Sequence, residues 1–210
     1  MLFCVDIGNT NITLGLYEGE TLGPRWRLAT DHERMPDEFL LQVLGLLSYA
    51  GLSRENVDGA AIASVVPPLT GKWVEVCQRG LGCKPLVIDA SVHTGVRVLY
   101  EDPSVVGADR LVDAVAAYRL YGGPTCIVDF GTATTFDAIS AEGDYLGGAI
   151  APGIGIAAQA LFERTAKLPR VELARPPAAI GRNTVHSIQS GLFFGYVSLV
   201  EGMVARFRQE

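Results

Sequence analysis

The sequence predicts an α/β protein built from two copies of one unit, and two pairs of matching segments carry this prediction. Residues 5–8 (Val-Asp-Ile-Gly) match residues 128–131 (Val-Asp-Phe-Gly) at an offset of 123. Residues 18–23 match residues 142–147 at an offset of 124, so one residue is inserted between the two matches. Matches in the same order at nearly the same offset favour a duplication over two unrelated hairpins with similar turns.

The first copy is predicted to run strand-strand-strand-helix-strand-helix-strand-helix. Three short strands open it, at 2–7, 11–17 and 23–29. A helix is predicted over 36–50, because five apolar side chains recur on one face: Phe39, Leu40, Val43, Leu44 and Leu47. The later elements are a covered strand (58–66) that Pro67 and Pro68 stop, a helix (69–79), a strand (84–89) and a helix (108–121).

The second copy is predicted to be shorter than the first. Its strands are expected at 125–130, 134–140 and 145–151, with helices at 153–166 and 184–207. The halves are 1–122 and 123–210, so the second has 210 − 122 = 88 residues. It is short by about a strand, a helix and a strand, so either its architecture is reduced or the sequence is a fragment.

Composition and charge narrow the classes of function. Apolar residues are 49% and charged residues 19% of the chain, which is typical of a globular domain with a core. The net charge is −6 and the densest basic stretch is only Arg25–Arg27, so we expect no nucleic acid or anionic membrane as partner. The uncharged stretch 184–200 contains several polar side chains, which disfavours a membrane span.

The cysteines and histidines indicate neither disulfides nor a metalloenzyme. None of the four cysteines forms a Cys-X-X-Cys pair, and no basic leader precedes the first strand, so we expect reduced thiols in a cytoplasmic protein. The three histidines, His32, His93 and His186, are too far apart in sequence for ligand spacing.

The two repeated turns have the residues that bind phosphate. Gly8 and Gly131 allow a sharp turn and close approach of the backbone to a ligand, and successive N–H groups in such a turn bind anions. Hydroxyl and amide side chains follow Gly8, and hydroxyl side chains follow Gly131. Asp6 could supply one of the one or two carboxylates that magnesium takes when it is bound to a triphosphate, and Asp129 could hold a second cation. An Asp before a Gly is also common in ordinary turns, but a matched pair favours phosphate.

Residues 100–118 form a third candidate element. Gly107 precedes a helix whose first turn contains Asp109 and Arg110. Asp109 could simply complement the helix dipole, with Arg110 as a solvated charge. The functional alternative is a kinase, in which the carboxylate accepts a proton from a substrate hydroxyl and Arg110 binds an acidic group of the substrate.

Five segments in order resemble one known family. These are 6–13 (DIGNTNIT), 107–110 (GADR), 129–137 (DFGTATTFD), 147–154 (GGAIAPGI) and 181–196 (GRNTVHSIQSGLFFGY). Together they resemble type III pantothenate kinase, over essentially the whole chain. The duplicated βββαβαβα plan resembles the actin, hexokinase and sugar-kinase superfamily, with a ribonuclease H-like fold in each half. The resemblance implies that ATP binds in the cleft between the halves, and that its phosphate passes to pantothenate, the first step toward coenzyme A.

The resemblance also implies roles for individual residues. The first ATP-binding turn would comprise Asp6, Ile7, Gly8, Asn9, Thr10, Asn11, Ile12 and Thr13, with Asp6 near Mg²⁺, and Thr132 would contact phosphate in the second turn. Asp109 would be the general base. Pantothenate would be bound by Tyr100, Gly107, Ala108, Asp109, Arg110 and Thr184. Asp129 would bind the monovalent cation, K⁺ or NH₄⁺, that the family requires.

A homodimer is implied as well, with Thr184 reaching the partner subunit's site. Gly191 and Gly195 lie four apart on an apolar helix and would allow a second helix to approach closely, between subunits or within one. Tyr100 could instead be a packed aromatic side chain, and Thr184 could be a helix N-cap. The role of Asp137 stays open.

Two other functions remain possible from the sequence. One is a non-catalytic relative that binds nucleotide or pantothenate as an accessory or regulatory protein. The other is a different phosphotransferase or phosphatase on the same fold. Family members usually continue with a strand and a Gly-Gly turn that helps to hold adenosine, and the 210 residues contain no such segment.

Overall fold

A computed structural model describes all 210 residues, which form two compact units. Unit 1 comprises Met1–Gly95 and Glu101–Val115, and unit 2 comprises Val96–Tyr100 and Ala116–Glu210.

Unit 1 contains a five-stranded mixed sheet in the order β3-β2-β1-β4-β5. Its strands are β1 (Leu2–Ile7), β2 (Asn11–Glu18), β3 (Thr21–Ala29), β4 (Gly59–Ser64) and β5 (Pro85–Ile88). The first three strands form antiparallel hairpins, whereas β4 and β5 run parallel to β1. The predicted strands of the first copy are therefore confirmed, and each lies within about two residues of its predicted bounds.

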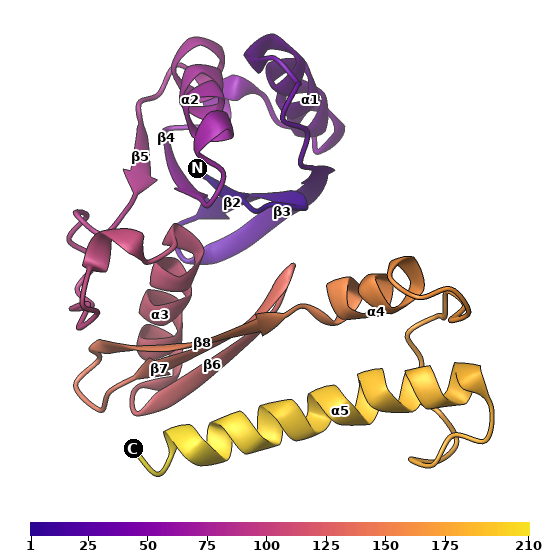
Figure 1. The fold of residues 1–210 in the computed structure, drawn as a ribbon. Coiled ribbons are helices and arrows are strands. Elements are labelled where there is room, and N and C mark those ends of the chain that lie inside the picture. The colour runs from indigo at the N-terminus through magenta and orange to yellow at the C-terminus, as the bar shows by residue number, and fades with distance from the viewer. The chain divides into compact units, whose positions relative to one another are not determined.

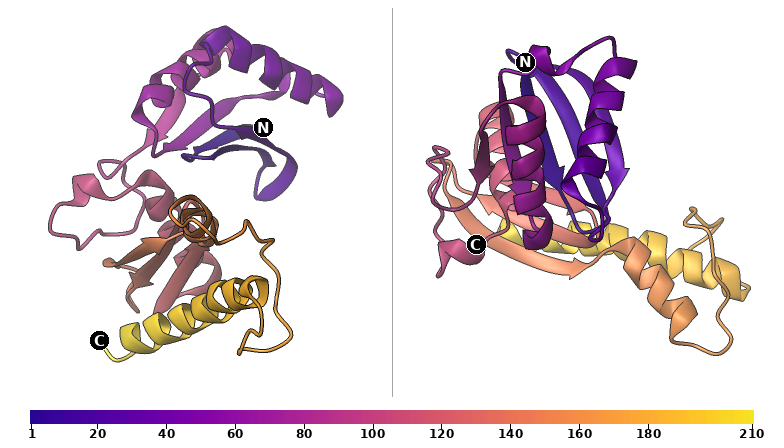
Figure 2. Two further views of the ribbon diagram at one scale, coloured as in Figure 1. Left: turned by 45° about the vertical axis from the view of Figure 1, so that its right-hand side comes forward. Right: turned by 90° about the horizontal axis from the view of Figure 1, so that it is seen from above.

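Two helices cover one face of this sheet, α1 (Pro36–Tyr49) and α2 (Pro67–Glu75) (Figures 1 and 2). Phe3, Val5 and Ile7 of β1 point into the core between the sheet and these helices, because side chains alternate between the faces of a strand. The rings of Phe39 and Trp73 lie 5.0 Å apart at its centre, and both side chains are fully buried. Cys4 and Asp6 lie on the opposite face of β1.

The second helix starts two residues before its predicted position. Pro67 and Pro68 are its first residues, because the first turn of a helix has N–H groups without intrahelical acceptors and proline lacks that N–H. A π-helical turn (Val76–Leu81) extends α2, and it ends at Gly82 in the left-handed conformation. Two short 3₁₀ turns, Arg54–Asn56 and Pro103–Val105, precede β4 and α3 (Ala108–Tyr121) respectively.

Unit 2 contains a three-stranded antiparallel sheet in the order β6-β7-β8. Its strands are β6 (Thr125–Phe130), β7 (Ala133–Ile139) and β8 (Tyr145–Pro152). They correspond to β1, β2 and β3, but no strand pairs with the other edge of β6 as β4 pairs with β1. The prediction that the second copy is shorter is confirmed at the level of the sheet.

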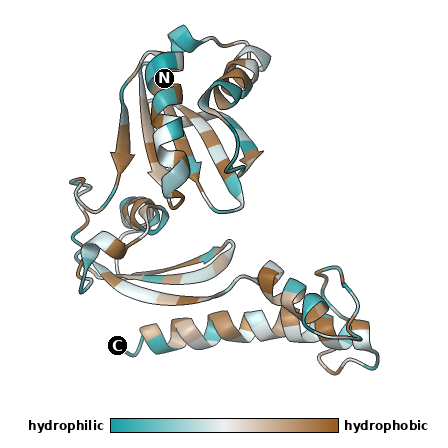
Figure 3. Cartoon of the chain, turned by 45° about the horizontal axis from the view of Figure 1, so that its top comes forward, coloured by the Kyte–Doolittle hydropathy of each residue, from teal (hydrophilic) through white to brown (hydrophobic).

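Two helices complete unit 2, α4 (Ile154–Glu163) and α5 (Thr184–Phe207). In Figure 1, α5 runs along the sheet, and the rings of Phe136 and Phe207 meet edge to face at 6.4 Å. Apolar residues recur along the whole of α5 (Figure 3). Length and composition alone would let α5 span a membrane, but core helices of soluble proteins pass the same test, so this is weak support for insertion.

Candidate functional site

The first candidate turn joins β1 to β2 and consists of Gly8, Asn9 and Thr10. The N–H of Gly8 donates to the carbonyl of Asn11 at 3.0 Å and closes the turn. A Cβ on residue 8 would lie 3.1 Å from that carbonyl oxygen, so the tight closure favours glycine.

The polar side chains of this hairpin gather on the face opposite the core. Asp6 pairs with Thr13 across the two strands, and both are exposed, as is Asn11. By contrast, the side chains of Ile7 and Ile12 are fully buried in the core. A ligand at this turn could therefore meet the backbone of these two residues but not their side chains.

The second candidate turn has the same construction with one residue fewer, Gly131 and Thr132 between β6 and β7. The N–H of Gly131 donates to the carbonyl of Ala133 at 2.9 Å. Asp129 pairs with Thr135 across the strands, as Asp6 pairs with Thr13, and Asp129 and Thr132 are exposed. The internal repeat thus extends from sequence to strand register.

Unit 1 brings the Gly107–Arg110 segment to the same sheet edge as the first turn. Val65, directly after β4, donates its N–H to the carbonyl of Ile7 at 3.0 Å. A Cβ on Gly107 would lie 3.3 Å from Cγ1 of Val65. Since β1 and β4 are parallel, this edge carries the carboxyl ends of both strands, the usual place for ligands in α/β sheets.

The carboxylate of Asp109 is oriented by the backbone N–H of the next residue, Arg110. Its Oδ1 accepts a hydrogen bond from the N–H of Arg110 at 2.7 Å and lies 2.5 Å from where a Cβ on Gly107 would stand. Any side chain at position 107 would therefore displace this carboxylate. Val106 and Ala108 are buried on either side, which anchors the segment, while Asp109 is only partly buried.

In unit 2, Tyr100 is held against the start of β8. The backbone N–H and carbonyl of Tyr145 bond to Arg97 and Leu99, each at 2.8 Å, so Val98 and Tyr145 form an isolated parallel β-bridge. The Arg97 guanidinium donates to Asp144, which lowers the pKa of that carboxyl. The ring of Tyr100 lies 6.4 Å from the ring of Tyr145.

The side chain of Asp137 supports the same arrangement, which answers a question the sequence left open. Asp137 is 1% exposed, and its Oδ1 accepts a hydrogen bond from the hydroxyl of Tyr145 at 2.7 Å. Its Oδ2 accepts one from Thr135 at 3.3 Å. Asp137 is therefore a buried structural carboxylate that fixes Tyr145, on which Tyr100 packs.

The structure does not bring Tyr100 and the second turn together. Tyr100 contacts the Tyr145–Gly147 end of β8, whereas Thr132 lies beside the other end, Pro152 and Gly153. Pro152 lies five residues along the strand from Gly147, a length of about 17 Å.

Thr184 is the first residue of α5 and lines a groove between α4 and α5. It is not the N-cap, which was one prediction from the sequence. Asn183 caps the helix, because its Oδ1 accepts the N–H of His186 at 2.8 Å. The exposed hydroxyl of Thr184 therefore has no capping role.

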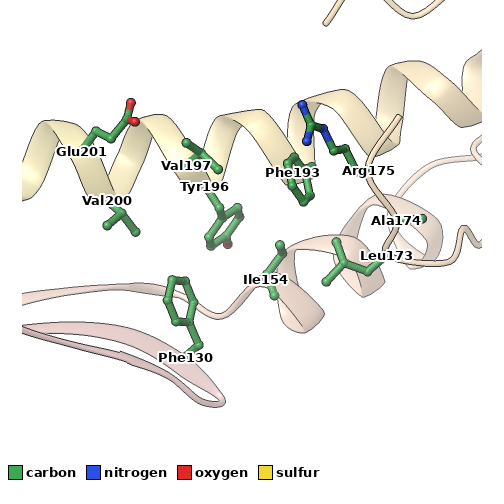
Figure 4. Close-up of a pocket in the computed structure, with 10 residues that line it drawn as sticks. All are labelled: Phe130, Ile154, Leu173, Ala174, Arg175, Phe193, Tyr196, Val197, Val200 and Glu201. Carbon is green, nitrogen blue, oxygen red and sulfur yellow. The ribbon is translucent and has the colours of Figure 1, made fainter. Parts of the chain in front are cut away.

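A mostly apolar cavity of about 700 Å³ lies between α5, the end of β6 and the start of α4. Figure 4 shows the rings of Phe130 and Tyr196 pointing toward each other across it, with Ile154 beside them. The hydroxyl of Tyr196 donates to the carbonyl of Pro152 at 2.7 Å, and burial raises the pKa of this hydroxyl. None of the predicted site residues lines the cavity, although Phe130 lies directly between Asp129 and Gly131 in the chain.

The cysteines and acidic residues give no sign of a further reactive centre. All four cysteines are free thiols, as predicted. Burial raises the pKa of Cys77 to about 12, and burial with the nearby Asp137 raises that of Cys126, so both thiols stay protonated near neutral pH. No three His, Cys, Asp or Glu side chains cluster as a metal site.

Known proteins resemble this chain over its whole length. Residues 2–206 match the profile of a family described as type III pantothenate kinase. A protein of that name from Moorella thermoacetica is 53% identical over 210 residues, which are 100% of this chain and 83% of that protein. Another from Roseiflexus sp. strain RS-1 is 50% identical and is covered to 82%.

A solved structure has a similar fold. It is described as a conserved Baf family transcriptional activator from Campylobacter jejuni, and it superposes with a TM-score of 0.54 at 21% identity. The match covers 96% of this chain and 78% of that one. A likeness at this level concerns the fold alone.

Proposed function

The chain belongs to the type III pantothenate kinase family, and we propose that its two glycine turns hold the phosphates of ATP while Asp109 takes the proton of the substrate hydroxyl. Membership makes the chain an ATP-dependent kinase that phosphorylates pantothenate in coenzyme A biosynthesis. A non-catalytic role or another substrate, which the sequence left possible, has no support among these relatives.

The proposal for the site rests on one sheet edge of unit 1, where the first turn and the Gly107–Arg110 segment lie together. The end of β1, the Gly8–Thr10 turn and the Gly107–Arg110 segment are linked there through Val65. A phosphate held by the turn would thus lie on the same edge as the carboxylate of Asp109. We propose that function divides along the repeat: residues 1–122 supply this edge, and residues 123–210 supply the second turn and α5.

The transfer step follows from this arrangement. The oxygen of the primary hydroxyl of pantothenate attacks the γ-phosphorus of ATP, the new P–O bond forms, and the bond to the β-phosphate oxygen breaks to release ADP. The hydroxyl proton moves to Oδ2 of Asp109, because Oδ1 is occupied by the N–H of Arg110. Such reactions depend mostly on positioning and electrostatics. The Arg110 guanidinium would bind the carboxylate of pantothenate, with Tyr100 as a further contact.

The residues fit a magnesium ion that is held mainly by the phosphates. Such an ion takes only one or two protein carboxylates, and the exposed Asp6 beside the first turn offers one. The bound ion would offset negative charge on the phosphates. Asp129, at the equivalent position of unit 2, would hold the monovalent cation.

A cation exchange tests the role of Asp129. Pantothenate-dependent ADP release should be faster in K⁺ or NH₄⁺ than in Na⁺, and Asp129→Asn should abolish that difference, because the amide carries no charge to bind the ion. Initial rates at equal ionic strength measure both effects. Equal rates in all three salts for the unaltered chain would contradict this assignment.

We also propose that the enzyme is a cytoplasmic homodimer and that α5 meets its symmetry mate. A Cβ at Gly191 or Gly195 would meet no atom within 4 Å outside the backbone of α5 itself, so no other helix of this chain packs closely against these two glycines. Thr184, on the same helix, would contact pantothenate bound to the partner subunit. Sedimentation equilibrium should give twice the mass of one chain, and a single-chain mass would contradict the dimer.

A further inference from the structure

The residue that directly follows the third strand of each unit contacts the carbonyl groups of the candidate phosphate turn. In unit 1 this residue is Thr30, whose N–H donates to the carbonyl of Thr10 at 3.0 Å. In unit 2 it is Gly153, whose N–H donates to the carbonyl of Thr132 at 3.1 Å. The two contacts are equivalent, since Thr10 and Thr132 are the last residues of their turns.

The side chain of Thr30 adds a second contact that the backbone cannot make. Its hydroxyl donates to the carbonyl of Gly8 at 2.6 Å, so Thr30 binds the first and the last carbonyl of the three-residue turn. The chain is fixed both before and after Thr30. It follows β3, and the next segment is fixed by Lys72, whose ammonium donates to the carbonyls of His32 and Arg34 at 2.8 and 2.9 Å.

In unit 2, where the turn is shorter, the turn carbonyls face residue 153 without a side-chain hydrogen bond. A Cβ on Gly153 would lie 2.3 Å from the carbonyl oxygen of Thr132 and 2.5 Å from that of Gly131. Both carbonyls therefore face the Cα of residue 153, and any side chain there would push them away. The residue after the third strand thus carries a hydroxyl group in unit 1, where the turn has three residues. In unit 2, where the turn has two residues, the equivalent residue has no side chain.

The carbonyl contacts also fix the direction of the N–H groups in each turn, because of the geometry of the peptide unit. A trans peptide is planar, and its C=O and N–H point in opposite directions. Because the carbonyls of Gly8 and Thr10 face Thr30, the N–H groups of Asn9 and Asn11 point away from it. In unit 2 the N–H groups of Thr132 and Ala133 point away from Gly153 in the same manner. Neighbouring N–H groups with a common direction are what a phosphate requires.

We propose that Thr30 and Gly153 are positioning residues for ATP, which orient the two phosphate turns without touching the nucleotide. The proposal rests on the function proposed above for these turns. Specifically, the Thr30 hydroxyl and the absence of a side chain at residue 153 affect the binding of ATP, through the turns, and not the binding of pantothenate.

The test for unit 1 compares Thr30→Val with Thr30→Ser. Valine keeps the shape and the backbone N–H but removes the hydroxyl, whereas serine keeps the hydroxyl. Thr30→Val should raise KM for ATP about tenfold and leave KM for pantothenate within about twofold, and Thr30→Ser should behave like the unaltered chain. Equal KM values for ATP in all three proteins, or a serine variant as impaired as the valine variant, would overturn the proposal.

The test for unit 2 does not depend on how well the Thr30 variants fold. Gly153→Ala should raise KM for ATP by at least about tenfold. Gly155→Ala, in the first turn of α4, should not raise it, since a Cβ on residue 155 would meet no neighbouring atom within 4 Å. Thermal unfolding of both variants checks that they are folded. If the unaltered chain has no pantothenate-dependent activity, the proposed function fails. If it is active and Gly153→Ala has a normal KM for ATP, the positioning role fails alone.

Discussion

Asp109→Asn is expected to lower turnover about a hundredfold or more, with small changes in KM for ATP and pantothenate. Asparagine has nearly the same shape, and its Oδ1 can still accept the N–H of Arg110. Its amide cannot take a proton from the substrate hydroxyl. The loss should therefore appear in kcat, as for an interaction that matters only in the transition state.

Glu101→Gln is the matched control for this variant. Glu101 is an exposed carboxylate in the segment that leads to α3, and it should be dispensable. Near-normal turnover of Asp109→Asn, or an equal loss in both variants, would show that the carboxylate of Asp109 is not the base.

Asp6→Asn is expected to lower turnover about a hundredfold at ordinary Mg²⁺ concentration, because the exposed carboxylate beside the first turn is lost. Raising the Mg²⁺ concentration should restore part of the rate, since the phosphates themselves still bind the ion. Initial rates against Mg²⁺ concentration measure this directly.

Glu18→Gln provides the comparison for Asp6. Glu18 is an exposed carboxylate at the far end of β2 from the turn, and its loss should leave the Mg²⁺ dependence unchanged. If Asp6→Asn shows the same Mg²⁺ dependence as the unaltered chain, Asp6 does not support the ion.

The sequence predicted the fold well where local patterns and tertiary structure agree. The hairpins of both units and the amphipathic helix over 36–50 follow from periodicity and turn residues. The helix at Pro67 was placed too late, because prolines that stop a strand also suit the first turn of a helix. The start of α5 at Thr184 was predicted, but the alternative that Thr184 caps the helix was wrong, since Asn183 and Thr184 are both good capping types and only geometry separates them.

The supporting residues of the candidate site were harder to predict. The contact of Asp137 with Tyr145 depends on a register shift between β7 and β8 that no short pattern reveals. Thr30 and Gly153 had a usable signal, because they are 153 − 30 = 123 residues apart, the same offset that relates Asp6 to Asp129. Their residue types differ, however, so a search for matching letters passes over them.

The fate of the γ-phosphate tests the central claim most directly. The 210-residue chain would be incubated with γ-labelled ATP, Mg²⁺ and K⁺, with and without pantothenate, and the labelled products separated. We predict one labelled pantothenate for each ADP formed, and almost none with Asp109→Asn. Label that appears only as inorganic phosphate, at the same rate with and without pantothenate, would contradict the account.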